Sequence, residues 1–542
     1  MLLAVLMLFT GIPASAYDFI SDGIPYNILS EEDRTVEVTY LSYQKSWKSG
    51  DVVIPKKVMV NSKTYTVTAI GGVAFKNCDE ITSITLPNSL TEIEGAAFSG
   101  CTSLTSITLP NSLTEIGQWA FNGCTSLTSI TLPNSLTEIY QSAFGGCTSL
   151  TCITLPNSLT KIREYVFRDC SSLTSITLSN SLTSIGNYAF EDCTSLTTIT
   201  LPNSLTKINK RAFDGCTNLE NINVETGNNA YSSIDGVLYD NGATTLIVCP
   251  QGKTSAPKIP ETLISIGNYA FEDCTSLTSI TLPNSLTSIG NYAFEDCTSL
   301  TTITLPNSLT SIGNGAFWSC TSLTSITLSN SLNSIGDAAF WSCTSLTSIT
   351  LPNSLTEIGG SAFWSCTSLT SITLPNSLTS IGESAFYKCT SLTSITLSKS
   401  LTKIGESAFE GCTELENIMN QSAVPVECNP KFADEVLKNA VLYVPTGTLA
   451  EYEKVDPWRN FWNIEEMDFS GIEEIEAGND SDIRLTVNGG VLTIDGIDSG
   501  ENIAVYDMQG RCVYCGTDRC IDNLAAGIYV LRAGHKILKF AI

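Results

Sequence analysis

The feature that most constrains this chain is a repeat of 23 residues that extends over most of its length. The segment LTSITLPNSLTEIGQWAFNGCTS, which starts at Leu104, is followed by LTSITLPNSLTEIYQSAFGGCTS, which starts at Leu127. A unit this short cannot bury its own Leu, Ile and Phe side chains, so it must stack on its neighbours. The repeat therefore predicts a solenoid in which each apolar position of the unit forms a continuous interior column.

Within the unit, the apolar residues follow the pattern L-x-x-I-x-L-P-x-x-L-x-x-I-x-x-x-A-F-x-x-C. The I-x-L part has the two-residue period of a strand, whereas the L-x-x-I and A-F-x-x-C spacings suit tighter coils. The Pro-Asn-Ser that follows ends the strand, because proline removes a backbone donor and Asn and Ser favour turns. We expect a repeat solenoid of short parallel strands joined by irregular connections.

A cysteine and a phenylalanine mark each unit. Fourteen cysteines stand in register, and each has a Phe three residues before it, from Phe75 to Phe409. The register breaks once, because Cys216 and Cys274 are 58 residues apart, which is not a multiple of 23. We therefore expect a variant, two-stranded insert at 217–263. The cysteines in register are Cys78, Cys101, Cys124, Cys147, Cys170, Cys193, Cys216, Cys274, Cys297, Cys320, Cys343, Cys366, Cys389 and Cys412.

The flanks of the repeats have a different pattern. Short alternating segments on both sides predict β caps over the exposed ends of the solenoid, and an acidic stretch rich in Gly and Ser predicts a linker. The last sixty residues alternate again and predict a small all-β domain. The predicted organisation is a signal peptide at 1–16, an N-terminal β cap at 17–64, repeats at 65–418, a C-terminal cap at 419–468, a linker at 469–482 and a small β domain at 483–542.

The first residues predict export. Leu2 to Phe9 form an apolar run too short to span a bilayer, and Ala14-Ser15-Ala16 offers the small residues that signal peptidase recognises. We expect cleavage before Tyr17, although no basic residue precedes the apolar run. No later stretch is apolar and long enough to cross a membrane. The mature chain is therefore predicted to be secreted or on the outer cell surface, without membrane insertion.

Composition argues against several classes of function. The single histidine is His535, so His-dependent nucleophiles and multi-histidine metal sites have no imidazole to recruit. The formal charge of −26 disfavours nucleic acid as a partner. Paired-carboxylate catalysis needs two acids facing one cleft, and the Asp and Glu residues are scattered over columns that we expect to be exposed. We predict no catalytic residues, no metal and no cofactor, and hence a protein that is not an enzyme.

The repeat resembles the BspA-like, or treponemal-type, leucine-rich repeat, whose unit is similar to C-x-x-L-x-x-I-x-L-P-x-x-L-x-x-I-G-x-x-A-F. The resemblance covers roughly residues 65 to 418, and Ile107, Leu109, Leu113 and Phe121 illustrate it in one unit. It implies a leucine-rich repeat solenoid of a surface protein. Members of this family are associated with adhesion to extracellular-matrix and plasma proteins and with attachment between cells.

The C-terminal segment is similar to the sorting domain of Bacteroidetes proteins exported by the type IX secretion system. The residues that carry this resemblance are Tyr506-Asp507, Gly510-Arg511 and Gly527-Ile528-Tyr529-Val530. The resemblance implies delivery to the outer surface or the medium.

The cysteines allow two interpretations. Stacked in one column about 5 Å apart, they lie within the Cα range of disulfides, but parallel Cβ vectors disfavour the required torsion. We expect buried free thiols, with disulfides as the alternative. Cys152 replaces the Ser of the S-I-T strand and should face outward. Cys512 and Cys515 form a single C-x-x-C, which alone is a weak zinc signal.

Two columns of aromatic residues are candidates for a binding surface. The position after the Phe carries Lys, Arg, Asp, Glu, Ser, Asn or Gly in nine units, so we expect it to face solvent, and then becomes Trp318, Trp341, Trp364 and Tyr387. A second column, two residues before the Phe, includes Tyr269 and Tyr292. Rigid aromatic area is a common anchor for protein and carbohydrate partners, although mutual stacking without a ligand is an equal alternative. Outward Ser and Thr residues, such as Ser106 and Thr108, form a further repetitive face.

The sequence therefore favours binding. We expect an adhesin-like surface solenoid that presents a repetitive face to host extracellular proteins or glycans. A structural surface-layer or spacer protein without a specific ligand is the alternative. The sequence does not identify the ligand or the oligomeric state.

Overall fold

The computed structural model of the chain describes residues 17–40, 50–426 and 428–469, and then the segments 484–488, 491–495, 503–507, 512–518, 520–521, 528–533 and 536–541. The predicted signal peptide and most of the predicted linker lie outside these residues. The chain divides into two compact units, residues 1–466 and 467–542, which we describe separately. None of the helices in the described residues is long and apolar enough to span a bilayer.

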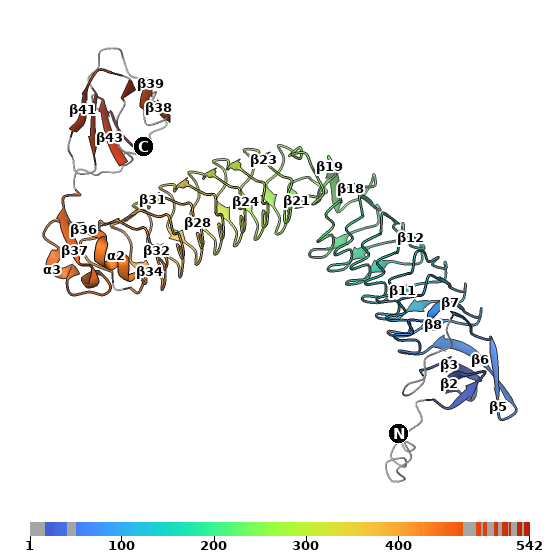
Figure 1. The fold of residues 1–542 in the computed structure, drawn as a ribbon. Helices are drawn as coiled ribbons and strands as arrows, with labels where there is room; N and C mark the ends of the chain where they lie inside the picture. Colours follow the sequence, from blue (N-terminus) through green and yellow to red (C-terminus); the bar gives the residue numbers. More distant parts are fainter. Residues whose placement is uncertain are drawn as a thin grey trace, which may run out of the picture. The chain divides into compact units, whose positions relative to one another are not determined.

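The first unit is a solenoid in which each 23-residue repeat makes one turn, as predicted (Figure 1). The S-I-T segments of successive turns pair in parallel, with each Ile opposite the Ile of the next turn. We call this the first ladder. Before the insert its strands are β4 (Gly50–Val53), β7 (Ile81–Thr85), β9 (Ser106–Thr108), β12 (Cys152–Thr154), β14 (Ser175–Thr177), β16 (Thr198–Leu201) and β18 (Asn221–Val224). After it they are β23 (Ser279–Thr281), β25 (Thr302–Thr304), β27 (Ser325–Thr327), β29 (Ser348–Thr350), β31 (Ser371–Thr373), β33 (Ser394–Leu397) and β35 (Asn417–Asn420).

A second ladder of two-residue strands lies beyond the Pro-Asn-Ser turn and was not predicted. It pairs the residue before each Ile, and the Ile itself, with the same positions of the next turn. Its strands before the insert are β8 (Glu92–Ile93), β10 (Glu115–Ile116), β11 (Glu138–Ile139), β13 (Lys161–Ile162), β15 (Ser184–Ile185) and β17 (Lys207–Ile208). After it they are β22 (Ser265–Ile266), β24 (Ser288–Ile289), β26 (Ser311–Ile312), β28 (Ser334–Ile335), β30 (Glu357–Ile358), β32 (Ser380–Ile381) and β34 (Lys403–Ile404).

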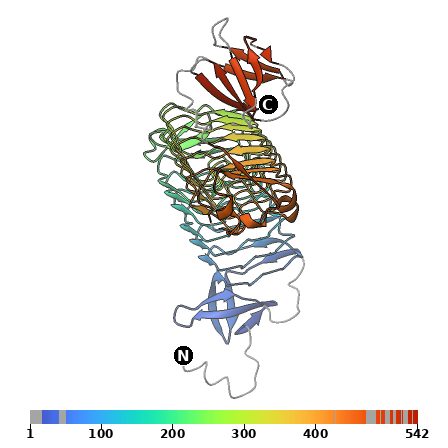
Figure 2. The ribbon, with the colours of Figure 1, turned by 90° about the vertical axis from the view of Figure 1, so that its left-hand side faces the viewer.

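The A-F-x-x-C segment closes each turn as a series of tight turns, which we call the turn side. Its backbone also bonds between neighbours, as when the Phe121 N–H donates to the Ala143 carbonyl at 2.8 Å. Hydroxyls add further bonds, because the Thr114 hydroxyl donates to the Thr91 carbonyl one turn earlier. Figure 2 shows the successive turns stacked in this way. Many of the Thr and Ser side chains are thus used within the solenoid.

The interior consists of the predicted columns of Leu, Ile, Ala, Phe and Cys, which are buried except for a few partly buried members such as Cys78 and Ile208. The Phe rings stack face to face, with centroids 5.2 Å apart between Phe294 and Phe317 and 5.3 Å apart between Phe317 and Phe340. The buried residues form two clusters that meet at the insert, one extending to Leu238 and the other starting at Val237. The column is continuous within each cluster, so a ring in either one supports both of its neighbours.

The cysteine column lies beside the Phe column as free thiols. In each regular turn the thiol donates a hydrogen bond to the Phe carbonyl of the turn before, as from Cys320 Sγ to Phe294 O at 3.1 Å. Burial raises the pKa of the Cys101 thiol to about 12. The thiols therefore fill the core as small hydrogen-bond donors. Cys152 is exposed on β12, as predicted.

The insert carries the chain between the two blocks of repeats. A hairpin of β19 (Tyr231–Ile234) and β20 (Val237–Asp240) is extended by β21 (Thr245–Val248), which pairs in parallel with β22. The insert thus has a third strand beyond the two that were predicted. Through β21 it supplies the first strand of the second ladder in the following block.

Caps cover both ends of the solenoid. At the start, β1 (Phe19–Ser21), β2 (Ile24–Ser30), β3 (Thr35–Val38) and β6 (Lys63–Ile70) form one sheet with β8, and β5 (Lys57–Val60) pairs with β6. At the other end lie α2 (Asp434–Asn439), β36 (Val441–Pro445), α3 (Leu449–Tyr452), the 3₁₀ helix η2 (Trp458–Asn460) and β37 (Asn463–Met467). The Phe432 ring stacks on Phe409 with centroids 5.5 Å apart, and Trp458 is fully buried. This cap therefore extends and closes the Phe column.

The second unit is built of antiparallel strands around a small core that includes Leu492, Val505 and Leu531. One sheet has the order β38 (Arg484–Asn488), β39 (Val491–Asp495), β42 (Cys520–Ile521). The other has the order β41 (Cys512–Gly516), β40 (Ile503–Asp507), β43 (Ile528–Ala533), β44 (Lys536–Ala541). Of the residues that resemble a sorting domain, Gly510, Arg511 and Gly527 lie outside the described residues.

Replacing either Phe317 or Phe340 with Ala should lower the free energy of unfolding by about 3 to 5 kcal/mol, because each removes a buried ring with a stacked neighbour on both faces. Urea unfolding followed by circular dichroism measures the loss. Thr327→Ala, on the exposed face of β27, is the control and should change stability by less than about 0.5 kcal/mol. A loss below about 1 kcal/mol for both Phe variants would contradict an interior column.

The buried cysteines should react slowly with a thiol probe in native protein and rapidly after denaturation. Their thiolate forms are disfavoured by burial, and the thiolate is the reactive form. Cys152 and Cys515, which are exposed, should react first. Counting the labelled thiols by mass spectrometry before and after denaturation checks this, and a denatured protein with nearly all cysteines oxidised would overturn it.

Candidate functional site

The turn side of the solenoid carries both aromatic columns. The position two residues before the Phe has a left-handed backbone in every repeat, with φ of 59° at Tyr269 and 55° at Tyr292. Aromatic residues seldom adopt this conformation. The position after the Phe ranges from exposed, at Lys76 and Arg168, to buried, at Glu272, which is just 6% exposed. The expectation that this column faces solvent throughout is therefore wrong, because neighbouring turns and the insert cover part of it.

The structure joins the two columns into one row of six rings, which we call the aromatic ladder. The ladder crosses from one column to the other between Tyr292 and Trp318, where the rings are 6.2 Å apart and tilted by 45°. The other steps are stacked, with centroid distances of 5.3 Å for Tyr269–Tyr292, 4.6 Å for Trp318–Trp341, 4.4 Å for Trp341–Trp364 and 3.9 Å for Trp364–Tyr387.

A glycine makes the crossing possible. Gly315 occupies the position that Tyr292 holds one turn earlier, and a Cβ on it would lie 2.4 Å from Cδ1 of the Tyr292 ring. The Tyr292 ring therefore lies over Gly315 and reaches Trp318. In the next turns Ala338, Ser361 and Ser384 stand at this position, so each turn of the ladder has one aromatic residue and one small or acidic residue at the two positions.

The ring faces of the ladder contact other side chains of the protein. Arg211 lies over the outer face of Tyr269, 4.9 Å from the ring centroid, and the Lys388 ammonium lies 5.2 Å from the Tyr387 centroid. All six side chains are partly buried. Among the described residues, none accepts a hydrogen bond from the indole N–H of Trp318, Trp341 or Trp364. What the ladder offers a partner is therefore ring edges and indole donors, rather than open ring faces.

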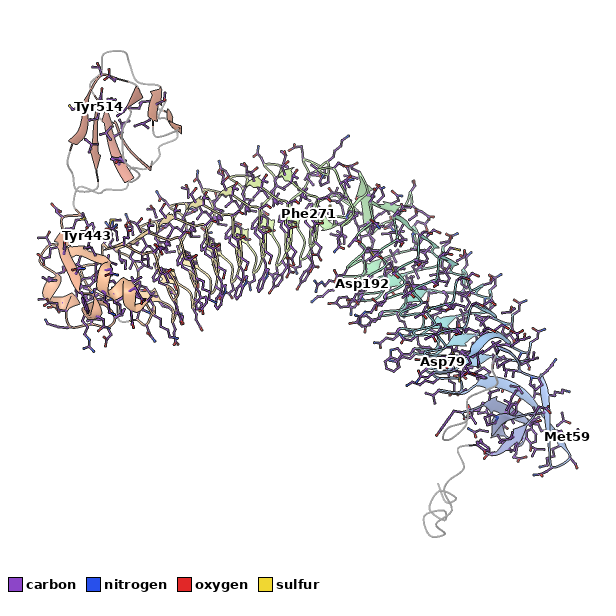
Figure 3. All side chains as sticks on the ribbon, in the orientation of Figure 1. Met59, Asp79, Asp192, Phe271, Tyr443 and Tyr514 are labelled. Carbon is purple, nitrogen blue, oxygen red and sulfur yellow. The ribbon has the colours of Figure 1, made fainter. Side chains whose placement is uncertain are left out.

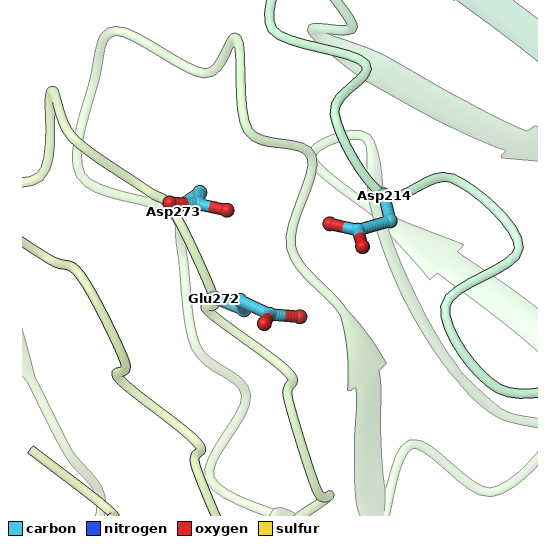
Figure 4. A group of neighbouring side chains, drawn as sticks. All are labelled: Asp214, Glu272 and Asp273. Atoms are coloured by element: carbon cyan, nitrogen blue, oxygen red, sulfur yellow. The ribbon is translucent and has the colours of Figure 1, made fainter. Parts of the chain in front are cut away.

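A cluster of carboxylates lies at the insert, next to the start of the ladder. Asp214, Glu272 and Asp273 converge across the junction between the two blocks, with ligand oxygens all within 4.8 Å of one another (Figure 4). Arg211 pairs with Asp214 at 3.3 Å and makes a two-bond ion pair with the buried Glu272. The expectation that the acids are scattered over exposed columns is wrong here, because the fold brings Glu272 and Asp273, which follow the insert, beside Asp214, which precedes it.

Further acids extend this cluster along the turn side, among them the half-buried Asp192, which is labelled in Figure 3. Burial, and then the charges of Asp296 and Asp214, raise the pKa of Asp273 above its usual value. Burial is also the main cause that raises the pKa values of Glu191, Asp192 and Glu295. The arrangement can hold a cation in principle, but Arg211 already supplies positive charge to two of its three carboxylates.

The Ser and Thr residues of the first ladder face outward, as Ser106 and Thr108 do on β9. They form a second regular surface. The aromatic site could be foreseen from column substitution, but Arg211, Gly315 and Lys388 could not. The folded structure shows that the two aromatic columns form one row. The left-handed backbone and Gly315 allow the crossing between them, and Arg211, which is distant in sequence, covers the first ring.

Stability should rise as the pH is lowered from 7 to about 5. Carboxylates with raised pKa values are stabilising when protonated, and this contribution is lost as the pH rises through their folded-state pKa values. Thermal melts at several pH values in constant salt measure the effect. The double variant Asp192→Asn, Glu295→Gln should flatten the profile, whereas a melting temperature that falls steadily from pH 7 to 5 would contradict this assignment.

Comparison with known proteins identifies the family to which these repeats belong. The family model described as the BspA type leucine rich repeat region matches in overlapping segments at 68–171, 139–252, 249–370 and 333–442. Among curated proteins, none matches the chain.

Several solved structures are similar to this chain. A leucine-rich repeat protein from Bacteroides ovatus is 30% identical, covers 83% of this chain and 100% of its own, and has a TM-score of 0.54. A leucine rich cell surface protein from Faecalibacterium prausnitzii is 30% identical over 74% of this chain and 94% of its own, with a TM-score of 0.52. A leucine-rich repeat protein from Eubacterium ventriosum, 24% identical over 72% of this chain and 93% of its own with a TM-score of 0.50, shares the fold.

The family model matches well over half of the chain, in the region where the ladders, the Phe column and the aromatic ladder lie. The chain belongs to the BspA-type leucine-rich repeat family.

Proposed function

We propose that the protein is an exported, cell-surface repeat protein that binds host extracellular proteins or glycans through the turn side of its solenoid. The aromatic ladder carries this proposal. It occupies positions where other turns have Lys, Arg, Glu or Ser, so the interior does not require aromatic residues there. The signal-like first residues and the similarity to a cell surface protein of Faecalibacterium prausnitzii support an extracellular location.

The chemistry of the ladder favours a partner rich in hydrogen-bond acceptors. Ring edges carry partial positive charge, and the indole N–H groups are donors. In the stretch from Cys297 to Gly382, which carries Trp318, Trp341 and Trp364, the only charged residues are Asp337 and Glu357, in contrast to the acidic chain as a whole. An extended polypeptide or a neutral segment of a polymer, lying along the ladder with its carbonyl or hydroxyl oxygens toward the edges, fits these properties.

Repetition strengthens such binding. The Trp318, Trp341 and Trp364 turns are nearly identical, so a long partner meets several equivalent weak contacts at once. Simultaneous engagement of linked sites raises avidity by about 10²- to 10⁴-fold without any single strong pocket. This is the expected behaviour of an adhesin that holds polymeric or clustered partners.

The second unit fits the same proposal. Its strands form two antiparallel sheets, and the sequence of β40 and β43 includes Tyr506-Asp507 and Ile528-Tyr529-Val530 of the sorting-domain resemblance. We propose that this unit directs the chain to the outer surface or the medium by the type IX route.

One observation favours the structural alternative, a spacer without a specific ligand. The ladder rings cover one another, and many hydroxyls bond within the solenoid. In a spacer these rings would serve to make the solenoid rigid. Replacing them would then lower the stability of the protein. The two functions therefore predict opposite results for the same substitution.

Replacing Trp318, Trp341 and Trp364 together with Ser should leave the melting temperature nearly unchanged and weaken binding to a panel of matrix proteins and glycans by at least about tenfold, as expected when several linked contacts are lost. Binding of the mature chain is measured on immobilised panels, alongside thermal melts. Trp119→Ser, a 46% exposed Trp outside the ladder, is the matched control. Intact binding with a collapsed melting temperature would support the spacer and refute the ladder as a contact surface.

A further inference from the structure

The three Trp residues of the aromatic ladder carry hydrogen-bond donors that the protein itself does not use. Among the described residues, no group accepts a bond from the indole N–H of Trp318, Trp341 or Trp364, and these nitrogens are not among the buried polar atoms that lack a partner. The three N–H groups are therefore both unpaired and accessible to solvent. Because the ring faces stack on one another, the edges and these donors are what a partner can contact.

A row of hydroxyls runs beside these donors. A serine follows each Trp, and the N–H of this serine donates to the carbonyl of the aromatic residue one turn later, as from Ser319 to Trp341 at 2.7 Å. These backbone bonds fix the spacing of the row. Within the described part of the chain, the hydroxyls of Ser319, Ser342 and Ser365 have no hydrogen-bond partner and are not buried. Three consecutive turns therefore each present one indole donor and one hydroxyl.

The repeat distance of these groups distinguishes between kinds of partner. The ring centroids are 4.6 Å apart between Trp318 and Trp341 and 4.4 Å apart between Trp341 and Trp364, and the rings are parallel to within 5°. An extended polypeptide presents carbonyls on one side at every second residue, about 6.5 Å apart, and a polyproline II helix repeats about every 9 Å. A polypeptide in either form therefore cannot pair with all three donors in succession.

A chain of pyranose sugars has a repeat closer to that of the ladder. Single bonds of about 1.5 Å make a chair-form pyranose about 5 Å long between equatorial oxygens on opposite sides of the ring. A linear chain joined through such oxygens places one sugar on each turn of the ladder. The sugar oxygens can then accept bonds from the indole N–H groups, and the sugar hydroxyls can exchange bonds with the serine hydroxyls.

Charge favours a neutral chain. The formal charge of the protein is −26, and no Lys or Arg occurs between Trp318 and Trp364. One of the two acids in this stretch, Asp337, already accepts a bond from the Gly360 N–H at 2.7 Å. An acidic polysaccharide would be repelled by the protein as a whole and would find no cation beside the three Trp residues.

We propose that the Trp318, Trp341 and Trp364 edges bind a neutral, extended chain of hexose sugars joined through equatorial oxygens, with one sugar on each turn. This inference rests on the proposed function, in which the ladder is the contact surface, and it selects a glycan over a polypeptide as the partner. Contacts that repeat in register act together along one chain. Affinity should therefore grow with the number of sugars until the chain covers the ladder.

Isothermal titration calorimetry on the mature chain tests this proposal. The probes are β-1,4-linked dimers and hexamers of glucose and of N-acetylglucosamine. The α-1,4-linked glucose hexamer, which has the same composition but an axial linkage and a coiled shape, is the control, and an oligoproline peptide represents a polypeptide. Trp341→Phe keeps a ring in the stack and removes only the indole N–H, so it separates hydrogen bonding from stability. Trp119→Phe, outside the ladder, is the matched variant.

We expect at least one β-linked hexamer to bind about tenfold or more tightly than its dimer and than the α-linked hexamer. Trp341→Phe should weaken this binding about fivefold, the factor for one neutral hydrogen bond, at an unchanged melting temperature, and Trp119→Phe should leave it unchanged.

Four results would each overturn the proposal: equal binding of the α-linked and β-linked hexamers, affinity that does not depend on length, tighter binding of the oligoproline peptide, or unchanged binding in Trp341→Phe. If matrix proteins bind in a Trp-dependent manner and no sugar chain does, this inference fails while the proposed function stands. Absence of any Trp-dependent binding on the protein and glycan panels would refute both.

Discussion

The structure depends on the requirement that every turn of 23 residues bury its apolar side chains against its neighbours. The Phe column shows this most directly, since each ring between Phe271 and Phe409 is sandwiched between two others. The thiol-to-carbonyl bonds and the hydroxyl bonds follow the same one-turn translation. All of these contacts join one turn to the next. A substitution in one turn therefore also affects the packing of its neighbours.

The distinctive groups of polar, charged and aromatic side chains lie where the repeat departs from its regular pattern. At the insert, the Phe column is interrupted, and Arg211 joins carboxylates from both blocks. At the Tyr140–Arg163 step, the second ladder opens into a polar pocket. At Gly315, a small residue lets the aromatic ladder cross between columns. In each case the chain departs from the residue or the spacing that the other turns repeat.

The aromatic ladder and the pocket at the Tyr140–Arg163 step differ in physical character. The aromatic ladder offers extended ring edges and repeated donors, with few charged residues around its three Trp residues, which suits a long partner held by many weak contacts. The pocket at the Tyr140–Arg163 step is lined by Lys161, Arg163 and Glu164, so it carries charges of both signs in a small volume.

The sequence by itself determined the solenoid, the interior columns, the position of the insert and the aromatic positions, because a 23-residue period with fixed apolar positions leaves one way to bury them. It did not determine the second ladder, whose two-residue strands are too short for a periodic signal. It also failed at Glu272, which was expected to be exposed and is buried against Arg211. Tertiary structure decided these features, along with the joining of Tyr292 to Trp318 and the pocket beside Arg163, because they depend on left-handed turns and on spacing between turns, which residue type at one position does not specify.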